Sequence, residues 1–282
     1  MKQLIIVFLA TTLLQPALAQ DMVYASTDSI FIENILKETQ CKEFSSPGDM
    51  IIDIAEKFIG KEYVAGTLDC HHNEPLVISS DKLDCTTFVE LVFAMAITAK
   101  ENDCSFGRVC SNLEKIRYRE GARNGYASRL HYISWWIDDN SQLELLCDVT
   151  SGKWSREQVL ELNFMSTHTS NYEQLKENPT LTAQIEEQEL PYRGVAVNYI
   201  PKEYLDKKKE ELDIENGDII ALVTNIAGLD VTHIGFAFWK NGELHLLHAS
   251  SSAGKVIRDD NTLFNYQKRR NSHIGIRVFR IQ

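Results

Sequence analysis

The stretch Leu83-Asp84-Cys85-Thr86-Thr87-Phe88-Val89-Glu90 joins a cysteine to a long apolar segment, since Glu90 is the only polar residue from 88 to 97. A helix without a polar face runs through the core of a protein. Asp84 can accept hydrogen bonds as its N-cap, so Cys85 falls in the first turn, where the helix dipole favours a thiolate. We predict that Cys85 is a nucleophile; the alternative is a buried structural thiol.

The beginning of the chain has the pattern of a secretory signal peptide. Lys2 precedes an apolar run from 4 to 14, and Ala17-Leu18-Ala19 follows. We predict that residues 1–19 are cleaved and that the protein is exported, most simply to the periplasm, without stable membrane insertion; the alternative is an uncleaved anchor. Residues 20–282 then form a single domain. The net charge of −11 argues against an electrostatic nucleic-acid partner.

All six cysteines follow the predicted cleavage site. If Cys85 stays reduced, an odd number is left for pairing, and Cys104 with Cys110 is the predicted disulfide because the two flank a short loop. Cys70-His71-His72 resembles half of a zinc site, but no second pair of ligands follows at short spacing. We expect no metal and no cofactor.

The hydrophobic periodicity predicts an α+β fold. Apolar residues recur at helical spacing over 28–36 and 47–59, and alternate at strand spacing over 218–223, 231–239, 244–249 and 274–281. Between them, residues 101–216 show no strand alternation. We interpret this segment as a mainly helical insertion, or lid, with helices over 128–137, 155–162, 171–177 and 202–212.

The insertion holds the candidate substrate-binding residues. Aromatic faces stack on sugar rings, and from the cluster over 126–136 we select Tyr126, Arg129 and Tyr132 as ligand-facing. For Trp135 and Trp136 we favour a place in the core. The polar loop over 163–168 is a second candidate rim, represented by His168.

The turn Asn241-Gly242 predicts a hairpin with a defined register. In that register His248 faces Gly235, and it becomes a diagonal neighbour of His233, about 7–8 Å away at the backbone. His245 falls on the other side of the ribbon. Gly235 and its small neighbour Ala237 leave room on the first side, where we expect the Cys85 helix to pack. A thiol, a base and an orienting group would then meet; the alternative is a structural histidine pair.

Five segments in order resemble the NlpC-type cell-wall hydrolases, a papain-like group of cysteine peptidases and amidases. They are Gly60-Lys61-Glu62-Tyr63, Asp84-Cys85-Thr86-Thr87-Phe88-Val89, Asn216-Gly217-Asp218-Ile219-Ile220, Thr232-His233-Ile234-Gly235-Phe236 and His248-Ala249-Ser250. The resemblance implies a papain-like core with a central cysteine-bearing helix on an antiparallel sheet. It also implies four catalytic residues: Cys85 as nucleophile, His233 as base, His248 as third triad member and Tyr63 with its hydroxyl in the site.

Two departures point to one branch of that group. Thr86-Thr87 stands where commoner members have Ser-Gly, and 148 positions separate Cys85 from His233. Both features resemble the N-acetylmuramoyl-L-alanine amidase-like branch. This implies hydrolysis of the amide between N-acetylmuramic acid and L-alanine in peptidoglycan or its fragments, through a thioester, by an enzyme that we expect to be a monomer. The alternatives are a γ-D-glutamyl-diaminopimelate endopeptidase and a non-catalytic muropeptide-binding protein.

Overall fold

Helix α3 (Cys85–Lys100) lies at the centre of the computed structural model, which describes residues 22–71 and 73–282. Its start is fixed by a capping box, in which Asp84 accepts from the Thr87 N–H at 2.8 Å and the Thr87 hydroxyl accepts from the Asp84 N–H at 2.9 Å. Every residue from 87 to 99 is buried. The predicted core helix is therefore confirmed in position and in burial.

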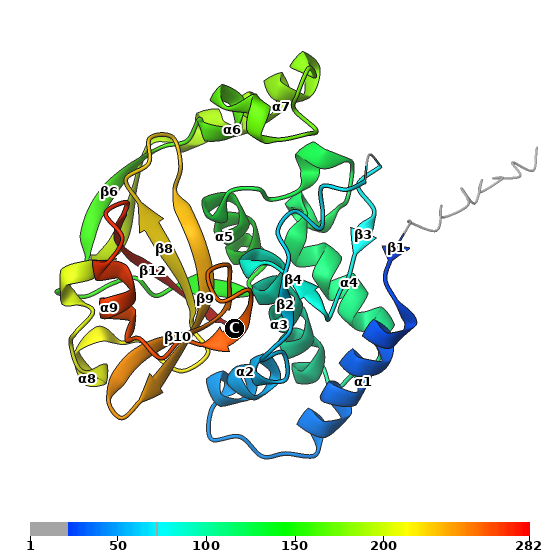
Figure 1. Ribbon diagram of the computed structural model, residues 1–282, viewed down its shortest axis with the longest axis vertical. Coiled ribbons are helices and arrows are strands. Elements are labelled where there is room, and N and C mark those ends of the chain that lie inside the picture. The colour runs from blue at the N-terminus through cyan, green and yellow to red at the C-terminus, as the bar shows by residue number, and fades with distance from the viewer. Residues whose placement is uncertain (1–21, 72) are drawn as a thin grey trace, which may run out of the picture.

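A layer of helices surrounds α3 on one side of the molecule (Figure 1). Its members are α1 (Ser26–Gln40), α2 (Pro47–Glu56), α4 (Phe106–Arg117) and α5 (Ile133–Gln142). The first two confirm the predicted helices. The other helices are α6 (Phe164–Thr167), α7 (Pro179–Glu189), α8 (Lys209–Leu212) and α9 (Leu263–Lys268). No helix in the described ranges is long and apolar enough to cross a membrane.

The other layer is a ten-stranded mixed sheet with the order β4-β2-β11-β10-β9-β8-β12-β7-β6, in which β5 also pairs with β12. Its strands are β2 (Glu62–Tyr63), β4 (Lys82–Leu83), β5 (Leu146–Asp148), β6 (Arg156–Glu161), β7 (Arg193–Pro201), β8 (Ile219–Thr224), β9 (Val231–Lys240), β10 (Glu243–Ser250), β11 (Lys255–Arg258) and β12 (His273–Ile281). A separate parallel pair joins β1 (Met22–Val23) to β3 (Leu76–Val77). The four predicted strands are confirmed as β8, β9, β10 and β12.

The β9–β10 hairpin has the predicted register. Lys240 pairs with Glu243, and the ladder continues to Phe236 opposite Leu247. Asn241 and Gly242 both have positive φ, at 54° and 80°, as a two-residue hairpin turn of this type requires. The register therefore follows from the turn residues alone.

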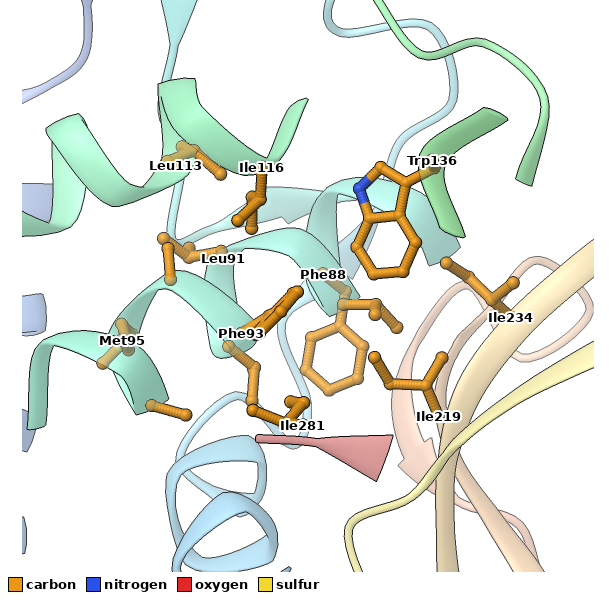
Figure 2. Packing of buried hydrophobic residues seen from close by; sticks show 14 of the residues in the cluster. Phe88, Leu91, Phe93, Met95, Leu113, Ile116, Trp136, Ile219, Ile234 and Ile281 are labelled. Carbon is orange, nitrogen blue, oxygen red and sulfur yellow. The ribbon is translucent and has the colours of Figure 1, made fainter. Parts of the chain in front are cut away.

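Helix α3 packs on the opposite face of this hairpin from the one predicted. Phe88 meets Phe236 edge-on at 5.7 Å, and Figure 2 shows the same packing around Ile219 and Ile234. The small residue Gly235 serves a different purpose, because a Cβ there would lie 2.8 Å from the Cβ of His248. The second face is covered by α9, where Leu263 packs in a separate cluster.

The segment 101–216 differs from the predicted helical insertion in containing three strands. Residues 156–161 form β6, which pairs with the unpredicted strand β7. The predicted helix over 171–177 is wrong, and α7 begins at Pro179 instead, because proline suits the first helical position and Asn178 supplies the cap. The helix expected over 202–212 is a 3₁₀ turn, Lys202–Tyr204, followed by α8. The predicted signal peptide, residues 1–19, lies outside the described residues.

Candidate active site

Cys85 is the first residue of α3 and reaches the beginning of β9. It is partly exposed, and it lines a pocket of about 100 Å³ together with Thr86, His131, Asp230 and His233. A β-bulge precedes His233, because the β8–β9 register shifts between the Leu222–His233 and Val223–Val231 pairs. Bulges redirect side chains near sites. The fold thus brings the thiol and the imidazole into one pocket.

The two predicted histidines are in direct contact. Nε2 of His233 lies 2.6 Å from Nδ1 of His248, and the rings are nearly perpendicular. His248 is completely buried. His245 lies on the other side of the hairpin, where its Nδ1 is 3.0 Å from the Asp259 carbonyl oxygen. The hairpin register predicted His248, and not His245, as the partner of His233, and the structure has this contact.

Asp259 extends the pair to a third group that sequence reasoning missed. Its Oδ2 lies 3.5 Å from Nε2 of His248, the outer limit of a direct hydrogen bond, and its Oδ1 accepts from Asn261 at 2.8 Å. Burial alone would raise the pKa of Asp259, yet hydrogen bonds from His248 and Asn261 lower it to about 2. The sequence signal that could have found Asp259 is the short strand β11. It pairs with β10, and its register places Asp259 diagonally across from His248.

Tyr63 occupies a strand position beside the nucleophile. It pairs with Leu83, two residues before Cys85, and its N–H donates to the Gly254 carbonyl at 2.9 Å. Burial, together with the negative charge that Cys85 and Asp84 can carry, raises the pKa of Tyr63 to about 12. Its hydroxyl therefore keeps its proton at neutral pH and remains a hydrogen-bond donor.

The protonation of the thiol differs from the prediction made from its helix position. Desolvation and the adjacent Asp84 carboxylate raise the pKa of Cys85 to about 11, outweighing hydrogen bonds from Ile234 and Thr86. Burial, together with repulsion by the positive charge that His248, His273 and Arg270 can carry, holds the pKa of His233 well below its usual range. At neutral pH the resting pair is therefore a neutral thiol and a neutral imidazole.

This protonation state predicts the pH dependence of alkylation at Cys85. Below a pKa of about 11 the thiolate fraction grows about tenfold per pH unit, so the iodoacetamide rate should do the same between pH 7 and 10. Peptide mass spectrometry would isolate Cys85 from the other five thiols. A rate already at its maximum near pH 7 would instead show a thiolate–imidazolium pair.

The predicted substrate-binding residues lie mostly away from the pocket. Tyr126, Arg129 and Tyr132 are 8%, 7% and 2% exposed. The guanidinium of Arg129 pairs with Asp69 and Glu74, and the Tyr132 hydroxyl donates to a carboxylate oxygen of Glu189 at 2.7 Å. The polar groups of Arg129 and Tyr132 are thus engaged by other residues of the protein. From this cluster His131 and Ile133 line the pocket instead.

His168 is exposed at the end of α6, where its ring stacks on Phe164 at 4.2 Å. Its loop docks on the loop before β9, because the N–H groups of Asn163 and Phe164 donate to the Gly228 carbonyl at 3.1 Å. Since Leu229 lines the pocket, the loop of His168 borders the site only through this neighbouring loop.

Trp135 and Trp136 are buried, as the sequence analysis favoured. They lie in the main hydrophobic core, which they share with α3.

The predicted Cys104–Cys110 disulfide is not present, and all six cysteines are free thiols. Cys104 lies before Ser105, the N-cap of α4, whereas Cys110 lies inside that helix and is buried. Its side chain packs among the core residues instead of turning back toward the loop.

The family model for AmiA-like proteins, described as N-acetylmuramoyl-L-alanine amidase-like, matches residues 53–276. The chain belongs to this family, and it is an enzyme of the amidase type. It is similar to the crystal structure of an N-acetylmuramoyl-L-alanine amidase from Bacteroides uniformis, with 40% identity and a TM-score of 0.79, covering 84% of this chain and 99% of that one.

Two further solved structures are similar. One, from Bacteroides fragilis and provisionally named a xylanase, is 45% identical with a TM-score of 0.76, covering 81% of this chain and 99% of that one. The other, protein LPG0564 from Legionella pneumophila, is 24% identical with a TM-score of 0.65, covering 90% and 96% respectively, and shows likeness of fold alone. No curated protein matches significantly. The NlpC-type, papain-like assignment stays a prediction.

Proposed function

We propose that the protein hydrolyses the amide between the lactyl group of N-acetylmuramic acid and L-alanine, in peptidoglycan or its fragments, through a thioester on Cys85. The family supports the class of reaction. The observation that carries the mechanism is one pocket containing Cys85 and His233, with Nε2 of His233 held by Nδ1 of His248 at 2.6 Å. That is the arrangement of a nucleophile, a base and an orienting group.

The row of polar groups fixes the tautomers that this mechanism needs. Ionised Asp259 can only accept, so Nε2 of His248 carries the hydrogen and its Nδ1 is an acceptor. Nε2 of His233 must then donate to that acceptor. This leaves Nδ1 of His233 with a free lone pair for the thiol proton. Asp259 and His248 are thus positioning residues in the proposed mechanism.

In the first step Sγ of Cys85 attacks the lactyl carbonyl carbon while its proton passes to His233. The oxyanion accepts hydrogen bonds from the Cys85 backbone N–H, which has no partner within the helix at this first position, and from Tyr63. His233 then protonates the departing nitrogen of L-alanine, and the C–N bond breaks. Water, deprotonated by His233, hydrolyses the thioester and restores the thiol.

Replacing Tyr63 by phenylalanine should lower kcat more than it raises KM, because the hydroxyl donates to a charge that develops in the transition state. Loss of one oxyanion donor costs at most a factor on the order of 10²–10³. Steady-state kinetics would measure both constants. Tyr24→Phe is the control, since that exposed tyrosine packs on Phe106 and neither residue lines the pocket of Cys85. Equal losses in the two variants would remove Tyr63 from the mechanism.

Mass analysis of products from a defined disaccharide-tetrapeptide tests the proposed bond. Free disaccharide and an intact tetrapeptide beginning with L-alanine are expected. Fragments cut after D-glutamate would instead place the protein among the endopeptidases, and binding without cleavage would make it a muropeptide-binding protein.

We further propose that the enzyme acts after export, which rests on the signal-like residues 1–19 alone. The N-terminal sequence of the protein recovered from the periplasmic fraction should begin near Gln20. Recovery of the uncleaved chain from the cytoplasm would contradict this.

A further inference from the structure

A second pocket beside the histidine pair is lined by cationic side chains. It has a volume of about 340 Å³ and is lined by Ser252, Asp259, Asn261, Tyr266, Arg269 and Arg270. Both arginines belong to the run Lys268-Arg269-Arg270, at the end of α9. The proposed bond-breaking steps use neither of them.

The two guanidinium charges are not neutralised inside the protein. Among the described residues, no carboxylate forms an ion pair with Arg269 or Arg270. Arg270 donates to the Tyr266 carbonyl at 3.2 Å and stacks on the Tyr266 ring at 3.9 Å. Asp259, the one acid in the lining, is engaged by Asn261 and faces His248. In a chain with a net charge of −11, this leaves two positive charges free for a ligand.

The cationic pocket adjoins the reacting groups. The ring of Tyr266 lies 6.5 Å from that of His233 and 5.6 Å from that of His248. Since Arg270 stacks on the same tyrosine, its guanidinium lies within about 10 Å of the His233 ring, which is no more than about three residue lengths. The charge of Arg270 also contributes to the lowered pKa of His233.

The proposed substrate carries its negative charge on one side of the scissile bond only. The muramoyl side is uncharged once the lactyl group is an amide. On the amine side, L-alanine is followed by D-glutamate, which continues the chain through its γ-carboxyl group and keeps a free α-carboxylate. That carboxylate lies two residues, about 7 Å, from the reacting amide.

Building on the proposed function, we propose that Arg269 and Arg270 form a subsite for this D-glutamate α-carboxylate. The muramoyl group then occupies the pocket of Cys85 and His131. The guanidinium groups offer charge-assisted hydrogen bonds that a carboxamide cannot match. The competing explanation is that the basic run only complements the C-terminal dipole of α9, in which case Lys268 would serve equally.

The test compares two substrates that differ by one group, muramoyl-L-alanyl-D-glutamate and its α-carboxamide, muramoyl-L-alanyl-D-isoglutamine. The wild type should cleave the carboxylate with a kcat/KM about 5- to 30-fold higher, the range for a partly exposed charged hydrogen bond. Arg270→Gln and Arg269→Gln should each reduce this ratio, and Arg270→Lys should retain most of it. Lys268→Gln, next to the pocket but not in its lining, should leave the ratio unchanged.

A ratio close to one in the wild type, or an equal reduction by Lys268→Gln, would overturn the subsite while leaving the proposed reaction intact. Calorimetric binding of both compounds to Cys85→Ala separates the subsite from catalysis. If the wild type cleaves neither compound, tighter binding of the carboxylate that Arg270→Gln removes would support the subsite without the reaction. Equal binding of the two compounds would reject it.

Discussion

Cys85→Ala should lower kcat on a muramoyl-L-alanyl substrate by a factor on the order of 10⁴ or more, the scale seen when a covalent nucleophile is removed. The thiol lines the same pocket as His233, and in the proposed mechanism it forms the bond to the acyl carbon. Its removal should barely change thermal unfolding, since Cys85 is only partly buried and the N-cap of α3 is the side chain of Asp84. Kinetics and a melting curve measure the two effects.

Cys41→Ala is the matched control, because it removes an exposed thiol at the end of α1. It should keep full activity. A Cys85→Ala enzyme that turns over substrate at the wild-type rate would eliminate the thioester mechanism. Loss of activity accompanied by a lower melting temperature would mean that the cysteine acts through the fold.

Arg117→Met should reduce the free energy of unfolding by about 3–5 kcal/mol, because it leaves Glu90 charged and unpaired in the core. Nε of Arg117 donates to Glu90 at 2.7 Å, and both side chains are 3% exposed or less. The guanidinium also donates to the Val77 carbonyl at 2.8 Å. This pair joins α4 to α3 inside the helical layer. Urea unfolding followed by circular dichroism would measure the loss.

The same two helices provide a control in the exposed pair of Arg108 with Glu101. Both side chains are more than 30% exposed, so Arg108→Met should cost no more than about 1 kcal/mol despite its two close hydrogen bonds. Glu90→Gln combined with Arg117→Met should recover part of the larger loss. Equal costs for the two arginine variants would show that the core tolerates the unpaired carboxylate.

The parts of the fold that the sequence predicts are those encoded by neighbouring residues. The capped apolar helix of Cys85 and the hairpin turn Asn241-Gly242 each depend on a short stretch, and both are found as expected. The contact between His233 and His248 follows from that turn by counting residues. Local signals therefore suffice for the histidine pair.

The features of the fold and the site that the sequence does not predict depend on contacts between segments that are far apart in the chain. The strand over 156–161 has no clear alternation and gains its partner only from β7. From the sequence, Arg129 resembles a ligand-binding residue. In the structure its guanidinium forms ion pairs with Asp69 and Glu74, which lie at least 55 positions earlier in the chain. The raised pKa of Cys85 likewise reflects its surroundings in the folded protein, which the helix position alone does not contain.

The row of His233, His248 and Asp259 runs across β9, β10 and the residue that follows β11, and this limits how the chain can change length. An extra residue inside β9 or β10 would turn one imidazole to the opposite face of the sheet. A Cβ at Gly242 or at Gly254 would meet nothing within 4 Å, but the Gly254 carbonyl accepts a hydrogen bond from the Tyr63 N–H, which ties the second turn to the site. Insertions in related chains are thus expected at the first turn rather than at the second, where they would disturb the position of Tyr63.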